Sequence, residues 1–101
     1  MSKQIVLELW NGIHGNKEDV YDYSGRLMKR SAIGNPNSNF EPTLDHIRPL
    51  SKGGKDVLQN LTICNRITNQ EKGDRFSTWN ANGKTFQAIR VKGNRAAYQI
   101  K

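Results

Sequence analysis

The sequence is poor in cysteine and has no long apolar runs. Its single cysteine, Cys64, excludes an internal disulfide and a structural zinc site of the usual multi-cysteine kind. No apolar stretch approaches the ~20 residues that a membrane-spanning helix needs. The start does not resemble a secretory signal peptide, because its short apolar segment is interrupted by Glu8. These absences predict a cytoplasmic protein whose partners are soluble molecules or nucleic acids.

Acidic residues are absent from the last quarter of the chain. Residues 1–74 hold ten Lys or Arg and all nine Asp and Glu, whereas residues 75–101 hold six Lys or Arg and no acid. The formal net charge of +7 therefore lies almost entirely in the C-terminal segment. Such a segment is typical of a surface that contacts phosphates, and a solvated basic hairpin that aids solubility is the alternative. Composition alone gives the two interpretations equal weight.

The 101 residues suffice for one domain, 1–101, with a modest core. Residues 5–10 suit a short helix, although so few residues leave a strand open. The pairs Asn11-Gly12 and Gly15-Asn16 are expected to break the chain. A small hairpin is expected around Ser24-Gly25, and a basic hairpin of 85–91 and 96–100 around Gly93-Asn94.

The middle of the chain predicts strand, long loop, strand and short helix. Residues 43–47 favour a strand stopped by Pro49, and residues 61–64 favour a second strand that contains Cys64 as a small core residue. Asn65 is a good N-cap for the helix, and Gly73 is a natural residue to end it. The predicted fold class is therefore α+β.

Polar residues of this middle region are spaced in a way that suits phosphodiester hydrolysis. Asp45 and His46 end the first strand, Asn60 follows 14 residues after the histidine, and Asn69 nine residues later. Histidine is the side chain best suited to accept a proton from water near neutral pH. A hard divalent cation neutralises charge on phosphate and prefers oxygen ligands, which Asp45 and Asn69 supply.

The same residues carry a family resemblance. The runs 44–54 (Leu-Asp-His-Ile-Arg-Pro-Leu-Ser-Lys-Gly-Gly), 59–61 (Gln-Asn-Leu) and 68–74 (Thr-Asn-Gln-Glu-Lys-Gly-Asp) resemble the HNH endonuclease motif of the ββα-metal nucleases. This core motif falls within 43–75. The upstream residues 21–26 and 34–35 resemble a subgroup of the family that lacks structural zinc. The last 25 or so residues carry no recognised motif.

The resemblance implies a metal-dependent endonuclease that cuts DNA. It makes His46 the general base, Asp45 and Asn69 the ligands of Mg²⁺ or Mn²⁺, and Asn60 the residue that braces the loop and helps to orient the histidine. Lys72 resembles a basic residue near the scissile phosphate. The expected partner is double-stranded DNA, and its expected contacts are Arg48, Arg75, Lys84, Arg90, Lys92 and Arg95.

The chain departs from the family pattern in two ways. Asn69 stands where many members have a histidine, and it still offers an oxygen ligand. The paired CxxC motifs that bind zinc in many members are absent. We therefore expect no structural zinc and a core held by packing, with Trp10, Tyr21, Tyr23 and Phe40 as the candidate aromatic residues.

Several other residues are expected to have ordinary structural or surface roles. His14 is predicted to lie in a solvated loop, and Asp22 and Asp56 to be turn or surface acids. Glu71 is expected on a solvated helix face, with an outer partner of the metal as the alternative. Trp79 is expected to be buried, with stacking on a base as the alternative.

Two other function classes stay open. One is a DNA-binding module that keeps the HNH shape without useful catalysis, and mutation of His46 would separate it from an enzyme. The other is a nuclease toxin domain, which ranks lower because such toxins carry a more histidine-rich end to the motif. A phage-encoded enzyme in the host cytoplasm suits the small size, as does a module of a larger nuclease or of a phage packaging assembly.

Overall fold

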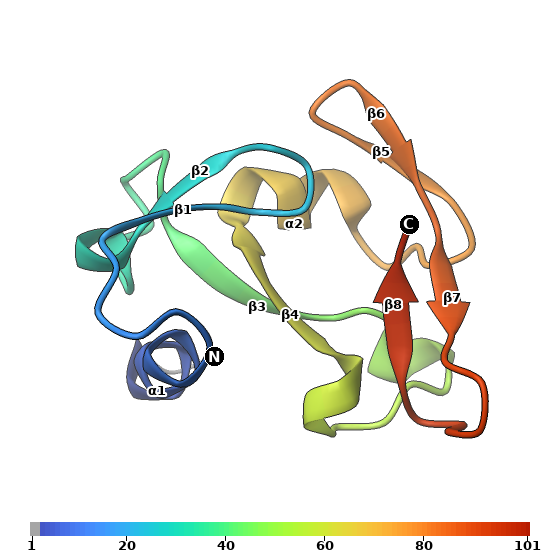
Figure 1. Ribbon diagram of the computed structural model, residues 1–101. Helices are drawn as coiled ribbons and strands as arrows, with labels where there is room; N and C mark the ends of the chain where they lie inside the picture. Colours follow the sequence, from blue (N-terminus) through green and yellow to red (C-terminus); the bar gives the residue numbers. More distant parts are fainter. Residues whose placement is uncertain (1–2) are drawn as a thin grey trace.

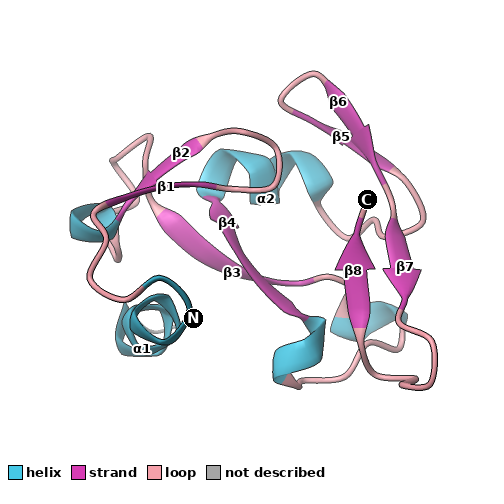
Figure 2. Ribbon diagram, viewed as in Figure 1, coloured by secondary structure: helices cyan, strands magenta, loops and turns pink. Residues whose placement is uncertain are grey.

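The computed structural model describes residues 3–101, so the first two residues of the predicted 1–101 domain lie outside it. Its helices and strands, in chain order, are α1 (Lys3–His14), β1 (Asp19–Tyr21), β2 (Leu27–Lys29), β3 (Pro42–His46), β4 (Leu61–Asn65), α2 (Arg66–Lys72), β5 (Trp79–Ala81), β6 (Lys84–Phe86), β7 (Ala88–Arg90) and β8 (Tyr98–Ile100). They confirm the α+β class (Figure 2). Within residues 3–101, no helix has the length and apolarity to span a membrane.

The strands pair as antiparallel two-stranded sheets of consecutive strands, β1–β2, β3–β4, β5–β6 and β7–β8. The β3–β4 pair runs through the middle of the molecule, with α2 directly after β4 and the last two hairpins at the C-terminal side (Figure 1). In its register Asp45 faces Thr62 and His46 faces Leu61. The sequence therefore placed both central strands to within one residue, and β3 ends at His46 rather than at Ile47.

The main apolar core lies between α1 and the β3–β4 pair. Val6 and Trp10 are one turn apart and are the buried residues of α1. They pack with Met28, Ile33, Leu44 and Ile63. The Trp10 ring is fully buried, and its Nε1 donates to the Lys17 carbonyl at 2.9 Å. This packing explains why the segment is a helix. A helix places residues 6 and 10 next to each other on one face, whereas a strand would hold them far apart.

The expected break at residues 11–12 is wrong. Helix α1 continues through Gly12 and ends at His14. The next residue, Gly15, has a φ of +64° and donates its amide to the Asn11 carbonyl. A glycine inside a helix costs only about 1 kcal/mol relative to alanine, which the packing of Trp10 outweighs. His14 therefore lies in the last helical turn rather than in a loop, with its ring 5.0 Å from that of Trp10.

The predicted set of core aromatic residues is correct only in part. Trp10 is buried, but Tyr21 is 69% exposed and Phe40 is 39% exposed. The strand alternation explains Tyr21: its neighbour Val20 packs against the core, so Tyr21 projects from the opposite, exposed face of the strand. Trp79 is buried as expected, and with Tyr23 and Phe86 it forms a second aromatic cluster.

Helix α2 begins and ends at the predicted residues. The Asn65 side chain accepts from the Ile67 amide at 2.8 Å, which confirms it as the N-cap. The backbone amide of Asn65 donates to Asp22 Oδ2 at 3.0 Å. Asp22 is thus a turn acid, as expected, but a buried one that joins the β1–β2 turn to the start of α2. Gly73 follows the last helical residue with a φ of +58°.

The C-terminal segment differs from its prediction. The strand expected at 85–91 is divided into β6 and β7 at Gln87, which exchanges two backbone hydrogen bonds with Lys101. β6 pairs with β5 across Asn82-Gly83, where both residues have a positive φ. β7 pairs with β8. The backbone bonds of Gln87 fix the point at which one hairpin gives way to the next.

Candidate active site

Strand β3 delivers Asp45 and His46 and ends at the histidine. Neighbouring side chains of a regular strand point to opposite faces, so the two could share a site only where the strand stops. After Pro49 the chain enters a short 3-10 turn at 50–52. The Asp45 side chain is 11% exposed and that of His46 is 18% exposed. Both side chains therefore lie at the margin of the interior, within reach of solvent.

Asp45 is paired with Lys72 from helix α2. The lysine Nζ lies 2.9 Å from Asp45 Oδ2, and the lysine side chain is completely buried. The contact is an ion pair without good hydrogen-bond geometry at Oδ2. Lys72 Nζ also donates to the His46 carbonyl at 3.2 Å and lies 5.3 Å from the centre of the Trp79 ring. Burial raises the pKa of the Asp45 carboxyl, and the ammonium opposes that rise.

Asn69 lies one helical turn before Lys72 and faces β3. Its Nδ2 donates to Thr43 Oγ1 at 3.1 Å and to the Leu44 carbonyl at 3.2 Å. These two bonds fix which end of the amide faces the strand. Within residues 3–101 the structure gives Oδ1 no donor, so this oxygen is the end left for a ligand. The structure thus brings Asn69 to the β3 segment that carries Asp45.

His46 contacts an acid that sequence reasoning did not connect with it. Its Nε2 lies 2.9 Å from Asp56 Oδ1. The Asp56 side chain is 78% exposed, so the prediction of a surface acid was correct but missed this contact. No spacing rule announces it, because residue 56 belongs to an irregular loop whose path depends on tertiary hydrogen bonds.

Asn60 supplies those hydrogen bonds and is fully buried. Its Oδ1 accepts from the Arg48 amide at 2.9 Å, and its Nδ2 donates to the carbonyls of Arg48 at 3.0 Å and Lys55 at 2.8 Å. Its backbone carbonyl accepts from the Ile47 amide at 2.8 Å. One side chain therefore joins the start of the loop to its end.

Gly54 is sterically required in the same loop. A Cβ built on it would lie 1.8 Å from the Arg48 carbonyl oxygen, a distance no real Cβ can occupy. Its amide donates to the Pro49 carbonyl at 2.9 Å. Gly53 has a φ of +91°, a left-handed conformation that favours glycine. The Gly-Gly pair thus allows the close packing of the loop on Arg48.

Two of the predicted DNA contacts meet around one tyrosine. Arg48 donates to the Tyr98 hydroxyl at 2.9 Å and Arg90 donates to the same oxygen at 3.1 Å. Arg48 also donates to the Lys52 carbonyl and stacks on Phe76, 5.0 Å from the ring centre. Arg48 therefore joins the loop between β3 and β4 to the β7–β8 hairpin.

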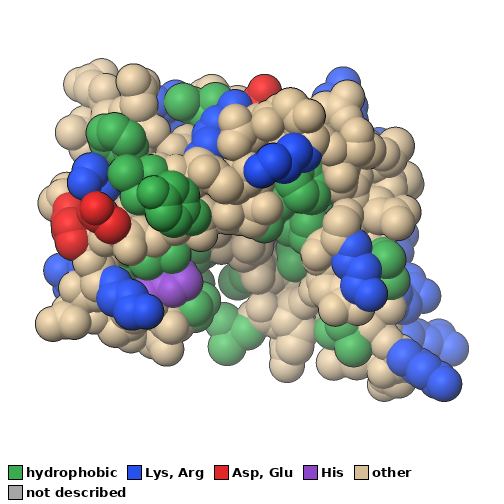
Figure 3. All heavy atoms as spheres, turned by 45° about the horizontal axis from the view of Figure 1, so that its top comes forward, with side chains coloured by type: hydrophobic (Ala, Val, Ile, Leu, Met, Phe, Trp, Pro, Cys, Tyr) green, Lys and Arg blue, Asp and Glu red, His purple; other side chains and the backbone are tan. Residues whose placement is uncertain are grey.

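The remaining predicted DNA contacts are spread over the C-terminal side. Lys92 and Arg95 are exposed in the loop between β7 and β8, and Arg75 is exposed after α2. Lys84 donates to the Ser24 carbonyl at 2.9 Å. In the space-filling view, Lys and Arg side chains lie on both sides of this face, but acidic groups show only at the left edge and at the top, and none among the basic groups at the right (Figure 3). The charge asymmetry of the sequence is thus also an asymmetry in space.

The residues at the end of β3 suit a hard divalent cation. Asp45 offers a carboxylate, and Asn69 offers an amide oxygen from the facing helix. Among residues 3–101 no cluster of three or more His, Cys, Asp or Glu could hold a metal. A magnesium site does not need one, because Mg²⁺ keeps several waters and takes one or two carboxylates with substrate oxygens. The donor set fits such an ion.

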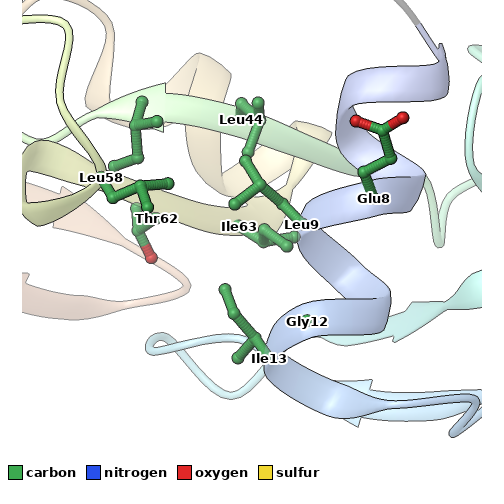
Figure 4. A pocket seen from close by; sticks show the side chains of 9 residues that line it. Glu8, Leu9, Gly12, Ile13, Leu44, Leu58, Thr62 and Ile63 are labelled. Atoms are coloured by element: carbon green, nitrogen blue, oxygen red, sulfur yellow. The ribbon is translucent and has the colours of Figure 1, made fainter.

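An apolar hollow of about 410 Å³ lies between α1 and the β3–β4 pair (Figure 4). Its lining includes Leu9, Ile13, Leu58 and Ile63, and the charged residue that contributes to it is Glu8. It shows no group of polar side chains that could perform chemistry. The candidate polar residues Asp45 and His46 lie instead at the end of β3.

A family model described as HNH endonuclease matches residues 22–78. The match begins at the turn between β1 and β2 and ends just before β5, so it includes every residue from Asp45 to Lys72. No curated protein and no solved structure matched the chain.

Proposed function

Because this chain belongs to the HNH endonuclease family, we propose that it is a metal-dependent endonuclease that hydrolyses phosphodiester bonds in duplex DNA. The observation that supports the proposal is that the three candidate residues lie on β3 and on the helix bonded to it, α2. Asp45 and His46 end β3, and Asn69 reaches β3 from α2 through Thr43 and Leu44. We assign β3, β4 and α2 as the ββα-metal core of this family.

In the proposed mechanism, His46 accepts the proton of the water that attacks phosphorus. A neutral imidazole has one ring nitrogen free to accept, and the histidine is held at the solvent margin by the end of β3. Mg²⁺ or Mn²⁺ held by Asp45 and Asn69 Oδ1 would supply neutralisation of the charge that develops on the phosphate. Asn60 holds the loop against Arg48 and so helps to fix the orientation of His46.

Lys72 acts on Asp45 in the conformation described here. The ammonium opposes the effect of burial on the carboxyl and so favours the ionised form that a metal needs. Its proposed place near the scissile phosphate stays a prediction, because the lysine side chain is completely buried. Movement of DNA into the site would have to bring the phosphate to this region.

The basic C-terminal side is the proposed grip on the DNA backbone. Phosphate contacts position the duplex without reading its sequence, which suits exposed arginines and lysines such as Arg75, Lys92 and Arg95. Arg48 and Arg90 both donate to the Tyr98 hydroxyl and would fix the β7–β8 hairpin relative to the loop between β3 and β4. One such site cuts one strand per encounter, so we propose nicking rather than double-strand cleavage by a single copy.

Incubation with supercoiled plasmid tests this proposal. We expect conversion to the nicked circle in Mg²⁺ or Mn²⁺ and no conversion in EDTA. A mobility shift of the DNA without cleavage in either metal would contradict an enzyme and indicate a binding module. Linear product at the earliest times would contradict nicking and require two cooperating sites.

A further inference from the structure

The contact between His46 and Asp56 gives the exposed acid a role. His46 Nε2 and Asp56 Oδ1 are 2.9 Å apart, within ordinary hydrogen-bond distance. A carboxylate only accepts hydrogen bonds, so the imidazole must donate through Nε2. The second ring nitrogen, Nδ1, is then the one that carries a lone pair when the ring is neutral.

The path of the loop explains why Asp56 reaches the histidine. Asn60 binds the carbonyl of Lys55, the residue just before Asp56, and both backbone groups of Arg48, two residues after His46. Gly54 lets the loop lie directly on the Arg48 carbonyl. The two chain segments are thereby held side by side, and the side chains of residues 46 and 56 meet across them.

We propose that Asp56 is a positioning residue, which holds His46 with Nε2–H bonded to its carboxylate and leaves Nδ1 to accept the proton of the attacking water. The proposal rests on the nuclease function above only for the identity of the reaction. The proton passes from water to Nδ1, and the imidazolium that results keeps its Nε2–H on the Asp56 carboxylate. Asn60 then orients the histidine through Asp56 as well as through the backbone.

The exposure of Asp56 limits the expected effect. Water competes for a carboxylate that is 78% exposed, so its loss leaves His46 present but free to rotate. General acid–base catalysis contributes about 10²–10⁴-fold to a rate. We expect Asp56→Ala to lose part of that factor, roughly tenfold in kcat. The KM for DNA should change little, because Asp56 touches the histidine and not the phosphate contacts.

Nitrogen NMR of the metal-free protein tests the contact without any cleavage assay. The chain has two histidines, so a His14→Gln variant identifies the His46 signals. At mildly alkaline pH we expect a hydrogen-bonded Nε2–H and an unprotonated Nδ1. In Asp56→Ala the Nε2–H signal should be lost to exchange with water. The same signal in both proteins would overturn the proposal.

Steady-state cleavage supplies the second test. Asp56→Asn keeps an oxygen that can accept from Nε2–H, so it should retain several times the kcat of Asp56→Ala. Asp19→Ala is the control, because it removes an equally negative, exposed group that pairs with Lys29 instead. Wild-type kcat in Asp56→Ala would overturn the proposal and leave the nuclease standing. If the wild type fails to cleave, the nuclease proposal fails, and the NMR result alone decides the role of Asp56.

Discussion

Lys72 Nζ lies 2.9 Å from Asp45 Oδ2, and the lysine side chain has no exposure to solvent. A buried ammonium without a partner is costly, and so is a buried carboxylate. Each charge therefore offsets part of the free-energy cost of burying the other. The pair also joins the end of β3 to the last turn of α2, the two elements that carry the proposed metal ligands.

Lys72→Met tests how far this pair stabilises the fold. The substitution keeps the length of the side chain and leaves the Asp45 carboxylate buried without its cation. Removal of one partner of a buried ion pair typically costs about 3–5 kcal/mol. We expect a loss of that size in the free energy of unfolding, measured with urea in the absence of metal.

The matched control for Lys72→Met is Lys52→Met. Lys52 pairs with Asp74 at 3.9 Å, and both side chains are largely exposed. Exposed pairs contribute about 0–1 kcal/mol, so its unfolding curve should nearly overlay that of the wild type. Equal stability of the two variants would show that the Asp45–Lys72 pair does not hold the site together.

Short-range patterns predicted the central elements well. The N-cap at Asn65 and the strands around residues 43–47 and 61–64 follow from side chains that act on their own neighbours. The hairpin at Asn82-Gly83 was missed although its signal is present, because Asn-Gly is the preferred pair for a turn with two positive φ values. Residues 85 and 86, which follow the turn, were instead assigned to one longer strand, 85–91, and residues 79–81 were assigned to none.

Gly54→Ala tests the path of the loop. The added methyl group would meet the Arg48 carbonyl, so the loop must move. We expect a loss of about 1–3 kcal/mol, as in other overpacked sites, together with a lower rate of cleavage. Gly12→Ala is the control: it lies inside α1 with nothing within 4 Å of its Cβ, and should gain about 0.5–1 kcal/mol. Identical melting of both variants would contradict the close contact.

Asn69→Ala tests the proposed metal ligand. Loss of a residue that only hydrogen-bonds a metal ligand typically lowers metal affinity roughly 10–100-fold. Loss of the amide oxygen itself should weaken Mn²⁺ binding by at least as much. Asn69→Asp should retain binding, since it still offers an oxygen. Gln70→Ala, an exposed neighbour on α2, should bind as the wild type does. Calorimetry or electron paramagnetic resonance of Mn²⁺ measures the metal affinity of the wild type and the three variants. An Asn69→Ala affinity equal to that of the wild type would exclude Asn69 as a ligand.

The active-site residues were predictable as types, but their partners were not. Asp45, His46, Asn60 and Asn69 stand at motif spacings. Asp45 and His46 lie on β3, Asn69 bonds to that strand from α2, and Asn60 braces the loop after it. The burial of Lys72 and the contact of Asp56 depend on how α2 and the loop pack, which no local pattern encodes. Arg48 shows the same limit, because its contact with Tyr98 joins residues 50 positions apart.

The salt dependence of DNA binding tests the basic hairpin. Log affinity falls as log salt rises. If Lys92 and Arg95 each neutralise a phosphate, each alanine variant should make this negative slope shallower by about 1. Lys29→Ala is the control, since that lysine is paired with Asp19 on β1. Fluorescence anisotropy with a labelled duplex gives the slopes. Unchanged slopes in both hairpin variants would place the DNA elsewhere.

The most direct test of the account is the comparison of His46→Ala with His14→Gln in plasmid nicking and in DNA binding. His46→Ala should bind DNA as the wild type does and should lose about 10²–10⁴-fold in the rate of nicking, the usual contribution of a general base. His14→Gln changes a histidine that packs against Trp10 and should nick normally. Nicking by His46→Ala at the wild-type rate would contradict the assignment of His46 as the base and, with it, the proposed active site.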